Sequence, residues 1–200
     1  MNDTDRKAKQ IDELRSALIF FSNGGKIDRE KWVVSQLLKA MRIDFKEDEL
    51  IAASEPADIE FRGVQFQVKE MLDKGRRRTD EYKQRLAKAE SARNFEELIE
   101  PYTPKDISFS KIVEQCYEYA ESLKTKYGWL ECKNIDLLCY FNWQDYSIVP
   151  PIEVFNKETI FRSLSVVSNL YCTVASVMPN APILLREHVG KVGTYREADA

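Results

Sequence analysis

Hydrophobic residues recur at helical spacing in the first part of the chain. In residues 4–21 one stripe contains four apolar residues, and the loop sequence SNGG ends it: Ile11, Leu14, Leu18 and Phe21. A second stripe follows Asp28, which is a favourable helix N-cap: Val33 or Val34, Leu37, Leu38 and Met41. The pattern therefore predicts helices over 4–21 and 28–42.

The spacing then changes to a strict alternation of apolar and polar residues. Residues 58–61 (DIEF) and 64–70 (VQFQVKE) both show it, and Arg62-Gly63 lies between them. Two alternating segments joined by two residues predict a β-hairpin. Its polar face would carry Asp58, Gln67 and Lys69. We also expect a short strand within 43–54.

The rest of the chain mixes helical and strand patterns. Helices are expected over 79–99 and 108–126, and the apolar run 134–142 (NIDLLCYFN) is typical of a buried strand. A further helix is expected from Asn156, with Ile160, Phe161, Leu164 and Val167 on its apolar side, followed by a buried strand at 170–178. A strand, helix and strand in this order predict a parallel crossover. The fold class is therefore α/β, with a central mixed sheet of four to five strands flanked by helices.

Length and composition indicate a globular protein. The 200 residues are 44% hydrophobic and 32% charged, which suits one domain with an appendage. We expect an N-terminal helix (1–25), an α/β domain (26–186) and a polar tail (187–200). The chain shows no apolar run of membrane-spanning length and no signal peptide, so we expect it in the cytoplasm.

Cysteine and histidine usage argues against two classes of site. The four cysteines are widely spaced without a CxxC pair, which favours free thiols over a zinc site. The single histidine, His188, lies near the C-terminus, which argues against a Ser-His-Asp triad.

Oxygen-bearing side chains of the hairpin and the second helix could bind a hard cation. Mg²⁺ prefers oxygen ligands and keeps several waters. Asp58 could supply a carboxylate oxygen, Gln67 an amide oxygen and Val68 its backbone carbonyl. Lys69 shares the strand face of Gln67 and could orient a water or stabilise negative charge. Glu30 lies on the apolar stripe of its helix and could reach a metal beside the hairpin.

This arrangement resembles the PD-(D/E)XK nucleases, the superfamily that includes restriction endonucleases. Glu30 matches the helix acid, Asp58 the first acid, Gln67 the variable acid position and Lys69 the lysine. The resemblance implies a restriction-endonuclease-like fold and hydrolysis of DNA phosphodiester bonds with Mg²⁺ or Mn²⁺. The chain is also similar to a bacterial family of uncharacterised, inferred endonucleases of about this length.

Two features depart from the superfamily pattern. The proline of Pro56-Ala57-Asp58 is displaced by one position, and Gln67 replaces an acid, which removes a negative charge from the metal site. Three interpretations therefore stay open: an active nuclease, a nucleic-acid-binding module that has lost catalysis, and a protein-interaction domain. In a fourth interpretation, Asp58, Gln67 and Lys69 form the solvated face of an ordinary hairpin.

A basic segment, KGRRR at 74–78, follows the second hairpin strand. We predict that its charged residues contact phosphates: Lys74, Arg76, Arg77 and Arg78. The net charge of −3 means that any attraction for nucleic acid would be local. The sequence predicts DNA as the partner but leaves structured DNA, RNA and a homodimer open.

Overall fold

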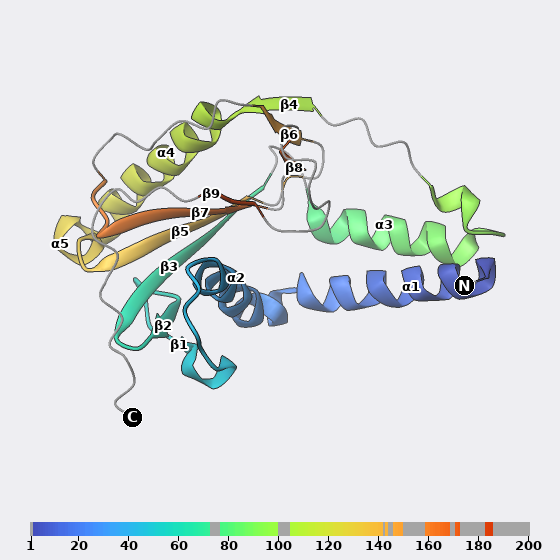
Figure 1. Ribbon diagram of the computed structural model, residues 1–200, viewed down its shortest axis with the longest axis horizontal. Helices are drawn as coiled ribbons and strands as arrows, with labels where there is room; N and C mark the ends of the chain where they lie inside the picture. The colour runs from blue at the N-terminus through green and yellow to red at the C-terminus, as the bar shows by residue number, and fades with distance from the viewer. Residues whose placement is uncertain are drawn as a thin grey trace. The chain divides into compact units, whose positions relative to one another are not determined.

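The computed structural model describes two compact units, which we treat separately (Figure 1). The described residues are 2–72, 77–99, 105–141, 143, 146–149, 159–168, 171–172 and 183–185. One unit comprises 1–29 with 74–103, and the other comprises 30–73 with 104–200. This division differs from the expected one, because the segment after the hairpin joins the N-terminal helix. The expected tail, 187–200, lies outside the described residues.

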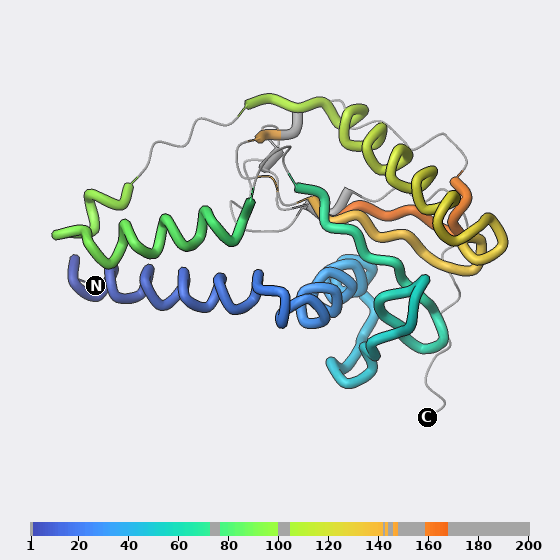
Figure 2. The backbone as a smooth tube through the Cα atoms, turned by 180° about the vertical axis from the view of Figure 1, so that it is seen from behind, coloured from blue at the N-terminus to red at the C-terminus, as the bar shows by residue number. Residues whose placement is uncertain are grey.

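The first unit is built on a pair of antiparallel helices (Figure 2). Helices α1 (Asp3–Phe20) and α3 (Arg78–Ser91) lie side by side. Arg15 donates to Glu90 at 2.8 Å, and the rings of Phe21 and Tyr82 stack at 5.2 Å. These contacts hold the two helices together, as the apolar stripe of 4–21 requires.

The second unit contains the central sheet. Its six described strands run in the spatial order β1-β2-β3-β5-β7-β9: Ile51–Ala52, Ile59–Phe61, Val64–Met71, Ile135–Phe141, Ser163–Ser168 and Ile183–Leu185. The pairs β3–β5 and β5–β7 are parallel, and the outer pairs are antiparallel. The sheet is therefore mixed, as predicted, with more strands than expected. A second, parallel sheet has the order β4-β6-β8: Lys105–Ser108, Tyr146–Val149 and Tyr171–Cys172.

Helices cover both faces of the central sheet (Figure 1). Helix α2 (Lys26–Ala40) contributes Val33, Val34, Leu37 and Leu38 to a core with Val64, Phe66 and Val68 of β3. Helix α4 (Phe109–Tyr127) packs Ile112, Cys116 and Ala120 against the other face, and α5 (Trp129–Cys132) follows it. No described helix combines the length and the apolarity needed to cross a membrane.

The hairpin prediction is confirmed. Strands β2 and β3 pair antiparallel, and the two loop residues Arg62 and Gly63 have φ values of 48° and 78°. A two-residue hairpin loop of the mirrored type needs positive φ at both positions, and Gly63 adopts it without strain. The apolar face of the hairpin is buried, since Ile59, Phe61 and Phe66 have no exposed area.

The C-terminal part of the prediction is partly wrong. The buried strand expected at 134–142 is β5, and all of its residues are buried. The helix expected to carry Leu164 and Val167 is instead strand β7, which pairs parallel with β5. Strand β7 (SLSVVS) alternates over residues 163–166, but Phe161, Leu164 and Val167 also recur at helical spacing, which favoured the helix prediction. Of the strand expected at 170–178, the described part is β8, in the second sheet.

The three described cysteines whose side chains are placed are free, as predicted: Cys116, Cys132 and Cys139. Burial raises the pKa of the Cys116 thiol, and the neighbouring Cys139 raises it further. A buried thiol with a raised pKa is inert. These cysteines therefore belong to the core.

A buried ion pair beside β5 generates a stability prediction. Arg162 donates to both carboxylate oxygens of Asp136, at 2.8 and 2.9 Å, and the side chain of Asp136 is 4% exposed. Arg162→Leu leaves that carboxylate without its partner, and we expect a loss of about 2–4 kcal/mol of unfolding free energy in urea titrations.

The control is Lys124→Ala, which removes an exposed pair with Glu121 and should cost less than about 0.5 kcal/mol. The double substitution of Asp136 and Arg162 by leucine should recover much of the loss. A loss for Arg162→Leu no larger than that of the control would contradict the prediction.

Candidate functional site

The candidate site lies where β3 extends beyond its hairpin partner. Strand β3 pairs with β2 over three residues, Val64–Phe66 in β3, but with β5 over seven. No described strand pairs with the β2 side of β3 after that point. Asp58 immediately precedes β2, so it stands at the boundary between the paired and the extended part of β3.

The main chain of Asp58 is held on both sides. Its N–H donates to the carbonyl of Phe66 at 2.8 Å, and its carbonyl accepts from the N–H of Ala53 at 2.9 Å. These bonds continue the sheet pairing by one residue past β2. The side chain of Asp58 is therefore presented from a fixed backbone.

The carboxylate of Asp58 closes the end of the hairpin. Its Oδ2 accepts from the backbone N–H of Val68 at 2.9 Å and from the side-chain Nε2 of Gln67 at 2.5 Å. Asp58 and Gln67 face the same side of the hairpin because they are opposite one another in the antiparallel register. The structure thus brings together two of the residues that the sequence singled out.

Lys69 extends the same face towards α4. It lies two residues after Gln67, and its Nζ is 4.8 Å from the centre of the Tyr119 ring. Burial raises the pKa of Tyr119, and the neighbouring Cys139 and Asp58 raise it further. Tyr119 is consequently a neutral phenol at physiological pH, and its ring face attracts the ammonium of Lys69.

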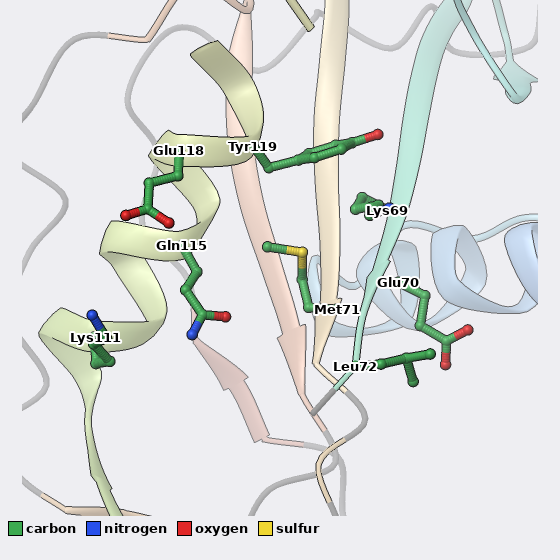
Figure 3. A pocket seen from close by; sticks show the side chains of 8 residues that line it. All are labelled: Lys69, Glu70, Met71, Leu72, Lys111, Gln115, Glu118 and Tyr119. Carbon is green, nitrogen blue, oxygen red and sulfur yellow. The ribbon is translucent and has the colours of Figure 1, made fainter. Parts of the chain in front are cut away.

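A groove of about 580 Å³ opens beside Lys69 (Figure 3). One wall is the end of β3, from Lys69 to Leu72. The other wall is α4, which contributes Lys111, Gln115, Glu118 and Tyr119. The volume suits a small ligand or part of a chain molecule. Its lining carries two lysines and two glutamates, so the formal charges of the groove cancel.

None of the four residues of the α4 wall was identified from the sequence as a site residue, and three of them form one row: Lys111, Gln115 and Tyr119. They are spaced four apart and so share one stripe of the helix. In the sequence, these residues form a stripe beside the apolar stripe of the helix. This pattern could have identified them as a group, but it did not show which strand they would face.

Glu30 belongs to the helix that covers the other face of the sheet. It is buried on α2, one helical turn before Val33 and Val34, which pack on the Phe66 and Val68 side of β3. Gln67 and Lys69 alternate with those residues and therefore face α4. Helix α2 and the predicted site thus lie against opposite faces of the sheet.

The backbone carbonyl of Val68 points towards the open edge of β3. Successive residues of a strand direct their N–H and C=O groups to alternate sides. The N–H of Val68 reaches Asp58, so its carbonyl points towards the same open edge of β3.

The basic segment belongs to the other compact unit. Lys74 and Arg76 lie outside the described residues. Arg77 is exposed and precedes α3, while the guanidinium of Arg78 lies 4.0 Å from the centre of the Phe21 ring. Arg78 therefore has a packing role in its own unit, and its contact with phosphate stays a prediction.

The oxygen donors at the site are few. Asp58 supplies the carboxylate, and Gln67 and Val68 supply carbonyl oxygens. Among the residues that the structure describes, no three His, Cys, Asp or Glu side chains form a group that could hold a metal ion. A cation here would rely on Asp58 and on carbonyl oxygens, with further ligands from outside the protein.

Comparisons with known proteins point to one family. The sequence profile of the family described as "Putative endonuclease, protein of unknown function (DUF1780)" matches residues 2–198. No curated protein matches the chain. A solved structure from Pseudomonas aeruginosa strain PAO1, described as a protein of unknown function of the monooxygenase superfamily, is similar with a TM-score of 0.52 and 20% identity. That match covers 94% of this chain and 98% of the other, and at this identity it shows the fold alone.

The contact between Lys69 and Tyr119 generates a prediction. Tyr119→Phe keeps the ring face, whereas Tyr119→Leu removes it and should cost about 0.5–1 kcal/mol of stability. In NMR spectra we expect ring-current shifts of the Lys69 side-chain methylene protons in the wild type and in Tyr119→Phe. Shifts that persist in Tyr119→Leu would show that Lys69 does not lie on this ring.

Proposed function

The chain belongs to the family DUF1780, and on that premise we propose that it hydrolyses DNA phosphodiester bonds with Mg²⁺ or Mn²⁺ at the site formed by Asp58, Gln67 and Lys69. We further propose that it is a PD-(D/E)XK nuclease of restriction-endonuclease-like fold. The mixed sheet with helices on both faces, and the position of the three residues on the β2–β3 hairpin, support this assignment.

One observation carries the proposal. Asp58, Gln67 and Lys69 lie on one face at the open end of the hairpin, and Lys69 lines a groove large enough for part of a nucleic-acid strand. A merely solvated hairpin face would not need a carboxylate anchored by two hydrogen bonds beside a lysine that is itself held over an aromatic ring.

The donor set fits a cation that also uses oxygens of the substrate. Mg²⁺ in phosphate-processing sites is held by one or two carboxylates together with substrate phosphates and waters. Asp58 would supply the carboxylate, with the carbonyl oxygens of Gln67 and Val68 beside it. When bound, such a cation supplies Lewis-acid activation of the phosphate and of a water. Glu30 is left out of this set because its helix packs on the other face of the sheet.

The residues of the groove have separate roles in the proposed reaction. The ammonium of Lys69 would orient the attacking water or stabilise the negative charge that develops on the phosphate. The neutral hydroxyl of Tyr119 can donate a hydrogen bond to a phosphate oxygen. Lys111 and Gln115, two and one helical turns away, would contact the neighbouring part of the strand.

A second candidate function is a nucleic-acid-binding module without cleavage. The observation that favours it is the amide of Gln67, which replaces an acid and donates a hydrogen bond to Asp58. Such a module would bind DNA in a salt-sensitive way and would show no metal-dependent hydrolysis.

The test is cleavage of labelled duplex, single-stranded and branched DNA, with RNA alongside, in Mg²⁺ and in Mn²⁺. We expect Asp58→Asn and Lys69→Met to lower the cleavage rate by about 10²–10³-fold, because each removes a charge that acts on the reacting phosphate. Asn keeps the side-chain size and Met keeps most of the stem, so both variants should stay folded.

Asp48→Asn and Lys39→Met provide matched controls, since they make the same chemical changes at exposed positions. Cleavage that survives in both site variants would contradict the proposed site. Salt-sensitive binding without cleavage by the wild type would support the second candidate. Neither cleavage nor binding would instead favour a protein-interaction domain.

A further inference from the structure

The side chain of Gln67 occupies the place beside Asp58 where a shared cation would have to bind. The two side chains are 2.5 Å apart, from Nε2 to Oδ2, and Gln67 is buried. The amide nitrogen faces Asp58 and donates a hydrogen bond to its Oδ2, the orientation that the hydrogen-bond network favours. The N–H proton of the amide therefore lies between the two side chains, in the place that a shared metal ion would occupy.

Coordination of a cation by the amide oxygen of Gln67 and this hydrogen bond exclude each other. For Gln67 to offer its carbonyl oxygen, the amide must rotate and give up its bond to the carboxylate. A charge-assisted hydrogen bond is stronger than a neutral one, so the rotation has a real cost. Among the described residues, no group of three His, Cys, Asp or Glu side chains is present to offset this cost.

We propose that Gln67 is an amide lock that makes cation binding conditional on the phosphate substrate. This inference rests on the proposed function and names a regulation of the same site. Without substrate, the amide of Gln67 keeps Asp58 paired. With a phosphate in the groove beside Lys69, the phosphate oxygens add the ligands and the negative charge that the protein lacks. Cation and nucleic acid therefore bind with positive coupling, and each raises the affinity of the other.

The lock can be removed by a single substitution. Gln67→Glu replaces the amide by a carboxylate and creates two adjacent acids. We expect it to bind Mn²⁺ without DNA at least about tenfold more tightly than the wild type, because the second charge adds to the attraction. Without Mn²⁺ the variant should melt at a lower temperature than the wild type, since the two like charges repel. Added Mn²⁺ should restore that loss.

The experiment measures Mn²⁺ binding by isothermal titration calorimetry and by thermal melting, so it does not depend on activity. The matched control is Gln65→Glu, which adds the same charge at an exposed position of the same strand face. Gln67→Asp is a second variant, with a shorter side chain that crowds Asp58 less. The wild type is also titrated with a phosphorothioate DNA hairpin carrying a single-stranded flank, which is hydrolysed slowly.

Three results support the inference together: weak Mn²⁺ binding by the wild type alone, binding that tightens at least about tenfold with the DNA analogue, and tight binding by Gln67→Glu or Gln67→Asp alone. Wild-type protein that binds Mn²⁺ without DNA as tightly as the acid variants would overturn it. So would acid variants that bind no more tightly than Gln65→Glu. If the acid variants bind Mn²⁺ but the analogue has no effect on the wild type, the lock is supported and its release by this substrate is overturned. Absence of cleavage by the wild type, with the coupling intact, would contradict only the proposed hydrolysis.

Discussion

The unequal length of two neighbouring strands is the constraint on which the candidate site depends. Strand β3 must pair with β5 along seven residues to complete the core, but β2 accompanies it for only three. The remaining edge of β3 needs a partner for the N–H of Val68, and the carboxylate of Asp58 supplies it. The site therefore arises where the hairpin ends and the parallel sheet continues.

Asp58 consequently serves the fold and the proposed chemistry with the same oxygen atom. Its Oδ2 ends the hairpin by accepting from Val68, and it is also the natural ligand for a cation. Gln67 completes the first role at the expense of the second. Lys69 is steadied independently, by the ring of Tyr119, so the cationic part of the site persists when the amide pairs with the carboxylate. The cationic and the anionic parts of the site can therefore change independently, as substrate-dependent cation binding requires.

Sequence patterns that fit only one secondary structure led to correct predictions. Alternation around Arg62-Gly63 identified the hairpin and the common face of Asp58, Gln67 and Lys69, because period and loop length leave no other register. Patterns that fit two structures did not: Leu164 and Val167 fit the apolar stripe of a helix but lie in a central strand. For Glu30, the helical stripe shows that the residue faces the sheet, but only the structure shows that its helix covers the face opposite Gln67 and Lys69.

The sequence by itself determined the elements and the residues of the hairpin face, since local spacing and turn chemistry act over a few neighbours. Only the tertiary structure decided what surrounds them. It placed α4 over the Lys69 face and α2 over the opposite one, which brought in Tyr119 and Gln115 and left Glu30 out. It also showed that the amide of Gln67 points at Asp58. These outcomes depend on contacts between residues far apart in the chain, for which the spacing of apolar and polar residues carries no information.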